Sequence, residues 1–207
     1  MDKPVIFPYG DTEIQYLTLR DPLLGAQINR IGPIRREMDT DLYSAVLHHM
    51  IGQQISMAAQ KTVWDRLEAM LGTVAPSAVI SAGADRIQSC GMTYRKAGYI
   101  YDFSKSIQNG ELDISVIEEM PDEDAIRALS GIAGIGRWTA EMILLFCFGR
   151  PDVFSYQDLA IRRGLCIIHG YDTICRSVFE KYRSLYSPYG STASLYLWAI
   201  ATEARYS

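Results

Sequence analysis

The chain has 207 residues, of which 48% are hydrophobic and 21% are charged. That length supports one sizeable core or two smaller ones, and because no stretch of 18 uncharged apolar residues occurs, no membrane span is expected. The formal net charge of −4 weighs mildly against a partner that is bound through many phosphate contacts. The acids gather at 111–124, however, so one side of the molecule can still be basic.

The cysteines carry no patterned spacing. Disulfide frameworks and zinc sites use closer, regular spacings such as CxxC, so we interpret the four as buried thiols: Cys90, Cys147, Cys166 and Cys175. Residues 1–4 lack the basic-then-apolar pattern of a signal peptide. We therefore expect a cytoplasmic protein.

The first half of the chain carries helix signals from residue 39 onward. Residues 1–10 are expected to be extended or irregular, and the first 40 residues are too weakly marked to place. The stretch Asp39-Thr40-Asp41 offers an N-cap, and Ser56 offers a second one, with Gly72 positioned to end that helix. Apolar residues at helical spacing and turn residues predict helices over 42–50, 57–71, 76–82 and 94–107.

The second half continues in the same way. Pro121 is expected at the first position of a helix that runs through Leu129. A glycine turn follows at 131–136, and then an apolar helix over 138–148. Further helices are expected from near Asp158, over 177–186 and over 192–204. Because alternation with period two is nowhere sustained, the predicted fold class is all-α.

The glycine turn is the most informative segment. Gly134 and Gly136 allow backbone conformations and close approaches that other residues do not, and the turn amides then point outward at the start of the next helix. Such an array binds a phosphate without any lysine. A plain helical hairpin that uses its glycines only for the turn is the alternative. The pattern Ile-x-Gly-Ile-Gly-x-x-Thr-Ala at 132–140 nevertheless resembles the DNA-binding helix–hairpin–helix motif, with Ala133 in place of the usual proline. The resemblance implies DNA contacts at Gly134, Gly136, Arg137 and Thr139.

An acidic residue follows the hairpin at a predicted helix start. Asp158 on its own is typical of an N-cap. Its context resembles the region of the 3-methyladenine DNA glycosylase II branch in which a Val-Phe pair precedes the catalytic aspartate, and this resemblance implies that Asp158 is catalytic. A carboxylate stabilises the positive charge that builds on the sugar as an N-glycosidic bond breaks. Arg162 and Arg163 follow within about one turn, where they either lower the pKa of Asp158 or contact the DNA backbone. Asp152, in a turn-like context, is the rival acid.

The position two after Gly136 separates branches of this superfamily. Bifunctional members carry a lysine there that attacks the sugar and cuts the strand. This chain has Trp138, which offers no nucleophile. We therefore expect base excision without strand cleavage. Only two cysteines follow Asp158, so the iron–sulfur cluster of some members is not expected, and no cofactor is required.

Two tryptophans are candidates for the base pocket. Trp138 and Trp198 both match family positions, and electron-rich indoles attract a positively charged alkylated purine. A tryptophan in an apolar helix is also common in a core. Met142 replaces an aromatic residue that stacks on the base in a well-known relative, so the substrate preference is open.

A third family-like segment is Ile51-Gly52-Gln53-Gln54-Ile55-Ser56. A glycosylase flips its target nucleotide out of the stack, and the resemblance implies that Gln54 fills the vacated space, with Gln53 as the alternative. The pair can also merely cap a helix kink. With the family-like residues 94–97, the resemblance covers about 42–201.

The resemblance as a whole implies a helix–hairpin–helix glycosylase unit with two helical subdomains, 36–145 and 1–35 plus 146–207, and a DNA-binding cleft between them. The expected activity is excision of alkylated purines from double-stranded DNA by a monomer, associated with the nucleoid if the source is bacterial. A structural Na⁺ or K⁺ ion is expected on the backbone carbonyls of Ser130, Ile132 and Ile135. The alternatives are a glycosylase of the same fold for oxidised or deaminated bases, and a DNA-binding protein without catalysis.

Overall fold

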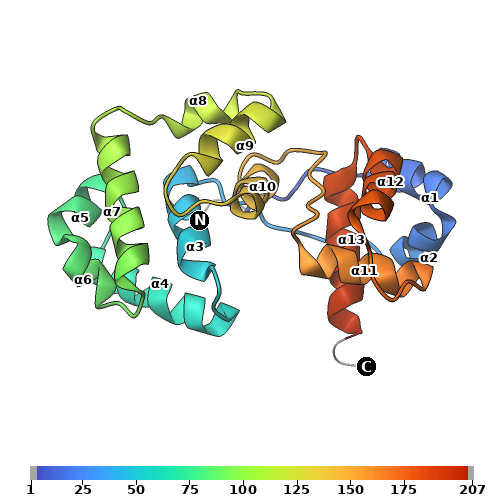
Figure 1. Ribbon diagram of the computed structural model, residues 1–207, viewed down its shortest axis with the longest axis horizontal. Coiled ribbons are helices and arrows are strands. Elements are labelled where there is room, and N and C mark those ends of the chain that lie inside the picture. Colours follow the sequence, from blue (N-terminus) through green and yellow to red (C-terminus); the bar gives the residue numbers. More distant parts are fainter. Residues whose placement is uncertain (1–3, 205–207) are drawn as a thin grey trace. The chain divides into compact units, whose positions relative to one another are not determined.

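The computed structural model describes residues 4–204 and is built from α-helices (Figure 1). An isolated antiparallel bridge joins Ile6 and Glu37, and no strand occurs within the described range. The all-α class is therefore confirmed. Residues 4–10 are irregular apart from that bridge, as predicted, and residues 1–3 of the predicted irregular stretch lie outside the described residues. No helix between residues 4 and 204 is both long and apolar enough to cross a membrane.

The chain divides into two compact units. One comprises Asp39–Cys147, and the other comprises the described residues up to Met38 and from Phe148 onward. The predicted subdomain, 36–145, has boundaries within three residues of these. We call the continuous stretch the central unit and the other part the terminal unit.

The central unit contains the helices on both sides of the hairpin (Figure 1). They are α3 (Leu42–Gly52), α4 (Met57–Leu71), α5 (Pro76–Ala82), α6 (Ala84–Gln88), α7 (Tyr94–Gln108), α8 (Ile114–Glu118), α9 (Asp122–Ser130) and α10 (Arg137–Phe146). Most lie where the sequence predicts them. The five-residue helices α6 and α8 were not predicted, because they are too short to show a helical period.

Local capping explains several of these helix starts. The Asp41 carboxylate accepts a hydrogen bond from the Ser44 amide at 3.2 Å, which caps α3. Ser56 caps α4 in the same way, through the Ala59 amide at 3.2 Å. Both N-caps were predicted from residue type. Pro121 lies at the N-cap of α9 rather than at the first helical position, one residue from its predicted place.

Helix α10 packs against α9 and α3. Seven of its ten residues are buried, including Ile143, Leu144 and Leu145, each with no exposed surface. A helix that is apolar on every side is stable only when neighbours surround it. The second helix of the hairpin is therefore held rigidly, and its exposed first turn presents a fixed surface.

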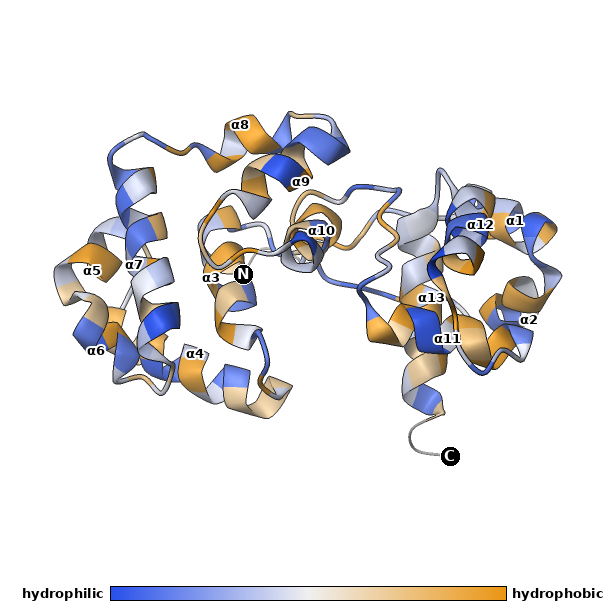
Figure 2. Ribbon diagram, in the orientation of Figure 1, coloured by the Kyte–Doolittle hydropathy of each residue, from blue (hydrophilic) through white to orange (hydrophobic). Residues whose placement is uncertain are grey.

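The terminal unit joins both ends of the chain. Its helices are α1 (Asp11–Arg20), α2 (Pro22–Ile31), α11 (Leu159–His169), α12 (Arg176–Tyr186) and α13 (Gly190–Glu203). Figure 2 shows hydrophobic and hydrophilic segments alternating along α11, as expected for an amphipathic helix. Its apolar face packs on α13, and both helices contribute to a core that also includes Leu17, Leu24 and Phe179.

The thiols are less uniformly buried than predicted. Cys90 and Cys147 are buried, as expected, but Cys166 is half-buried and Cys175 is exposed. Cys175 is exposed because it is the N-cap residue of α12 and precedes the first turn of that helix. The interpretation of all four as buried thiols is wrong for these two residues.

Candidate functional site

The hairpin turn requires glycine at one position. Gly134 has a φ of +90°, which favours glycine. A Cβ atom at Gly134 would also lie 2.5 Å from Cδ2 of Tyr99 on α7. Both the backbone conformation and the packing of the turn against α7 therefore exclude a side chain here.

At Gly136, in contrast, neither the backbone conformation nor the surrounding atoms require a glycine. Its φ of −88° is ordinary, and a Cβ built on it would meet no atom within 4 Å. It is the N-cap residue of α10, and no side chain caps the helix there. The first amides of α10 thus open onto an exposed surface at 136–138, where a phosphate can accept hydrogen bonds from them.

Gln53 links this turn to the end of α3. Its side-chain Nε2 donates to the carbonyl oxygen of Gly134 at 2.7 Å and to Oγ1 of Thr139 at 3.2 Å. These two contacts join residues more than 80 positions apart in sequence. Thr139 is only 3% exposed, so its predicted role in DNA binding rests on its backbone amide.

Lys96, on α7, also binds the C-terminal end of α3. Its ammonium group donates to the carbonyl oxygens of Ile51 at 2.8 Å and Gln53 at 2.6 Å. A cation at the C-terminal end of α3 complements the helix dipole and satisfies carbonyls that lack helical partners. Burial lowers the pKa of Lys96. The sequence placed residues 94–97 in a family-like segment but did not assign this capping role.

Gln54 follows the C-cap residue of α3, Gln53, and is exposed. Among the described non-glycine residues, it has the one positive φ, +60°. Such a conformation carries a backbone strain of roughly 1–2 kcal/mol, which the contacts of Gln53 and Lys96 hold in place. The side chain of Gln53 is thus engaged within the protein, whereas that of Gln54 is presented to solvent.

The remaining hairpin residues differ in exposure. Trp138 is 37% exposed at the first turn of α10, whereas Met142 is 2% exposed and lies in the core of the central unit. Arg137 forms ion pairs with Glu123 at 2.8 Å and Glu141 at 3.0 Å. Its charge is therefore largely compensated, and its pKa is raised, chiefly by the hydrogen bond to Glu123.

In the terminal unit, Asp158 is the N-cap of α11 and is 7% exposed. Its Oδ1 atom accepts hydrogen bonds from the amides of Ala160 at 2.9 Å and Ile161 at 3.0 Å. The same oxygen accepts a third hydrogen bond, from the indole Nε1 of Trp198 at 3.1 Å. Three donors on one oxygen hold the carboxylate in a defined orientation.

A close helix contact brings Trp198 to this position. A Cβ on Gly164 of α11 would lie 2.6 Å from the carbonyl oxygen of Leu197 on α13. The absence of a side chain at Gly164 therefore lets the two helices approach closely. A pocket of about 250 Å³ lies alongside, lined by residues that include Leu159 and Ala201.

The two arginines after Asp158 contact residues other than Asp158. The guanidinium of Arg162 lies over the ring of Tyr156, 5.0 Å from its centroid. Arg163 Nη2 donates to the carbonyl oxygen of Ala204 at 3.4 Å. Arg163 remains exposed, so it keeps a surface for a ligand.

Asp152, the rival acid, has a structural role. Its Oδ2 accepts a hydrogen bond from the Ser187 hydroxyl at 2.7 Å, and its Oδ1 accepts one from the Gly190 amide at 3.1 Å. It thereby satisfies the first backbone amide of α13.

The carbonyl groups predicted to hold a cation are those of Ser130, Ile132 and Ile135. Neutral carbonyl oxygens suit a hard monovalent cation. The Ile132 carbonyl accepts the Ile135 amide at 3.0 Å, and its second lone pair remains for an ion. We propose that a Na⁺ or K⁺ ion bound by these carbonyl oxygens would add positive charge beside the turn amides.

A buried polar cluster in the terminal unit was not anticipated. Asp21, 4% exposed, caps α2 and accepts a hydrogen bond from the Tyr186 hydroxyl at 2.6 Å. His169 Nε2 lies 3.1 Å from the same carboxylate. The pair Asp21-Pro22 is an N-cap followed by a proline at the first helical position, a signal that could have located α2.

Comparison with known proteins agrees with these features. Residues 47–188 match the family described as HhH-GPD superfamily base excision DNA repair protein. The chain belongs to this family.

Three relatives illustrate the similarity. The chain is 28% identical over 170 residues, 78% of its length, to YfjP of Bacillus subtilis, whose name assigns it provisionally to the DNA-3-methyladenine glycosylases. It is 26% identical over 180 residues, 84% of its length, to DNA-3-methyladenine glycosylase 1 of Schizosaccharomyces pombe. The chain spans 59% and 79% of the lengths of these two relatives. A crystal structure of a DNA-3-methyladenine glycosidase from Bacillus halodurans superposes with a TM-score of 0.85 at 27% identity, covering 97% of this chain and 94% of the other.

Proposed function

We propose that this protein is a monofunctional DNA glycosylase that flips out and excises alkylated purines of the 3-methyladenine and 7-methylguanine type in base excision repair. The observation that carries the proposal is the Asp158 carboxylate, held by three N–H donors at the start of α11. The names of the relatives support the substrate class.

The chemistry requires one carboxylate and one water molecule. The bond between C1′ of the sugar and the purine nitrogen breaks, and its electron pair leaves with the base. Alkylation has already made that base cationic, so it departs as a neutral molecule. The anionic Asp158 stabilises the oxocarbenium-like sugar and orients the water that adds to C1′ and loses a proton.

The hairpin provides the grip on double-stranded DNA. The open space at Gly136 and the uncapped amides of α10 support a phosphate contact that depends on backbone groups. A monovalent cation on the carbonyls of the turn would strengthen this contact. Because Arg137 is paired with two acids, it is expected to contribute less to affinity than the turn itself.

Gln54 is the proposed wedge. Its exposure and its strained backbone support a role in filling the gap left by the flipped nucleotide. Gln53, the alternative, holds the hairpin instead.

The base pocket is proposed to include Trp138 and Trp198. Stacking and cation–π attraction to a charged purine are worth roughly 0.5–2 kcal/mol per ring. Met142 remains a candidate for the pocket, although its burial leaves it little surface to offer. Trp138, in the position of the lyase lysine, supports excision without strand cleavage.

Base release from methylated duplex DNA tests this function. Wild-type protein is expected to release 3-methyladenine and 7-methylguanine, identified by chromatography, whereas Asp158→Asn releases neither while keeping its affinity for DNA. Asp172→Asn, at an exposed acid of the same unit, serves as the control. Full base release by Asp158→Asn would overturn the mechanism.

Two other outcomes would support the alternatives. Release of only oxidised or deaminated bases would indicate a different substrate class, as the Met142 position allows. Tight binding to damaged duplexes without any base release would indicate a binding protein. A covalent adduct after borohydride trapping would contradict the absence of lyase activity.

A further inference from the structure

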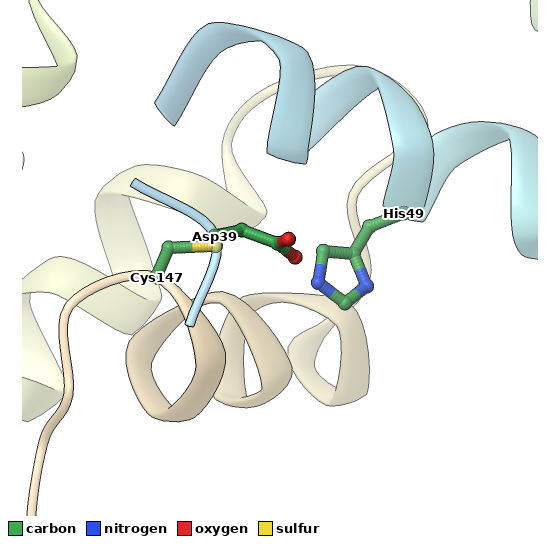
Figure 3. A group of neighbouring side chains, drawn as sticks. All are labelled: Asp39, His49 and Cys147. Carbon is green, nitrogen blue, oxygen red and sulfur yellow. The ribbon is translucent and has the colours of Figure 1, made fainter. Parts of the chain in front are cut away.

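Three side chains with different donor atoms converge in the central unit, apart from every residue assigned above to DNA or catalysis. They are Asp39, His49 and Cys147, and one carboxylate oxygen, one imidazole nitrogen and the Sγ atom all lie within 4.8 Å of one another. Figure 3 shows the Asp39 carboxylate directed toward the His49 ring and the Cys147 Sγ directed toward Asp39. The three come from different parts of the chain: the segment before α3, the last turns of α3, and the end of α10.

This combination of donors matches one ion better than others. A thiolate and an imidazole together favour zinc among the common metals, and carboxylate is its third usual ligand. One Zn²⁺ with one thiolate and one carboxylate has no net charge, which suits a site where the thiol is buried. Three protein ligands leave a fourth tetrahedral position for water.

The geometry requires little adjustment. Zinc bonds of about 2.0–2.3 Å place tetrahedral ligand atoms about 3.5 Å apart. The observed atoms lie within 4.8 Å, so a contraction of about 1 Å would complete the site. Asp39 is exposed, and its carboxylate can rotate without disturbing the core. Cys147 is buried and fixed as the C-cap of α10.

The location suggests what an ion would do there. Asp39 is the first residue of the central unit and Cys147 is the last. The Asp39 amide donates to the carbonyl oxygen of Phe146 at 2.9 Å, and the ring of His49 stacks on that of Phe146 at a centroid distance of 6.4 Å. An ion bound by the three residues would join both ends of this unit to α3.

We propose that Asp39, His49 and Cys147 bind one zinc ion that braces the two ends of the central unit. When the sulfur–zinc bond forms, the Cys147 thiol gives up its proton to water, and no oxidation is involved. In the metal-free protein, burial and then the negative charges of Asp39 and Glu118 raise the pKa of this thiol. A divalent cation relieves the same unfavourable charge environment.

Cobalt titration of the full chain tests the site, because Co²⁺ replaces zinc and reports on its ligands. Chelator-treated protein is expected to bind one Co²⁺ with a thiolate-to-cobalt charge-transfer band in the near ultraviolet and visible bands typical of tetrahedral coordination. Zinc then displaces the cobalt at a stoichiometry of one. A wild-type protein without the charge-transfer band would overturn the proposal, whatever the behaviour of the variants.

Variants assign the ligands. Cys147→Ser is expected to abolish the charge-transfer band, and Asp39→Asn, at an exposed position, to weaken zinc binding at least tenfold without loss of fold. Cys90→Ser, the other buried thiol of the central unit, is the matched control and should bind normally. Zinc should raise the melting temperature of the wild type and Cys90→Ser but not of Cys147→Ser. Equal zinc affinity in Asp39→Asn and the wild type would exclude this site.

Discussion

The indole Nε1 of Trp198 donates a hydrogen bond to Oδ1 of Asp158 at 3.1 Å, across 40 positions of sequence. The sequence predicted both residues as parts of a site, but with separate tasks, one in the base pocket and one at the sugar. We therefore expect Trp198 to help position this carboxylate, because its N–H donates to the same oxygen as two backbone amides of α11.

Trp198→Phe separates these two tasks. Phenylalanine keeps an aromatic ring but removes the donor. Hydrogen bonds to charged groups contribute about 1.5–3 kcal/mol, so we expect kcat for base release to fall about tenfold or more, with little change in KM. Single-turnover base release from methylated duplex DNA measures this. A rise in KM at constant kcat would instead assign Trp198 to base stacking, and Trp64→Phe in α4 controls for the general effect of the substitution.

The hairpin glycines form a matched pair with opposite expected effects. Gly134→Ala introduces a side chain at φ +90° and 2.5 Å from Tyr99, so it should lower the free energy of unfolding by about 1–3 kcal/mol. Gly136→Ala should change stability by less than about 1 kcal/mol, yet weaken DNA binding about tenfold, since the methyl group occupies the space that a phosphate approaches. Urea denaturation and fluorescence anisotropy with duplex DNA measure the two effects. Unchanged affinity in Gly136→Ala would remove the hairpin from the DNA interface.

The adjacent glutamines are also distinguishable. Gln53→Ala removes two hydrogen bonds to the hairpin and should lower stability by roughly 1–2 kcal/mol. Gln54→Ala removes no described contact of this kind and should leave stability within about 0.5 kcal/mol, while slowing base release from duplex DNA. On a substrate with the damaged base in a single-stranded or mismatched context, the Gln54→Ala defect should shrink, because flipping is easier there. If Gln54→Ala is fully active on duplex DNA, the wedge lies elsewhere.

Alkaline pH should destabilise the central unit through Tyr43. Burial raises the pKa of this residue from 10.0 to about 12, and the charge of Asp41 adds to this effect, whereas the hydrogen bond between the Tyr43 and Ser104 hydroxyls opposes it. In the unfolded chain Tyr43 loses its proton first. Its contribution to stability is therefore fully present below about pH 10 and is lost as the pH rises toward 12. Urea denaturation across this range should show a shallower decline for Tyr43→Phe than for the wild type. Tyr94→Phe, at an exposed position, should leave the decline unchanged.

Helix caps and turns, which depend on residues close together in the chain, were predicted correctly from the sequence. The caps Asp41, Ser56 and Asp158 and the hairpin turn at 131–136 all appear where expected. Each depends on residues within one helical turn of one another, so residue type and spacing are sufficient. Helices α1 and α2 were not predicted, although the pair Asp21-Pro22 marks the start of α2.

Side-chain partners across long stretches of chain were not predicted. Gln53 and Lys96 each match a family-like segment, yet the sequence does not indicate that one holds the hairpin and the other caps α3. Asp21 and Tyr186 lie 165 positions apart. Such pairs depend on how helices pack, and packing has no local pattern in the sequence.

Asp158 illustrates both what the sequence determines and what depends on the tertiary structure. Sequence alone determined that an aspartate begins a helix after the hairpin, because N-cap preference is a property of the residue and its own backbone. Only the tertiary structure decided that an indole from α13 shares its oxygen, because the close approach at Gly164 brings the two helices together. The convergence of Asp39, His49 and Cys147 is of the same kind. Their spacing in the chain has no metal-binding pattern. They become neighbours because α3 packs against α10 and the Asp39 amide bonds to the Phe146 carbonyl oxygen.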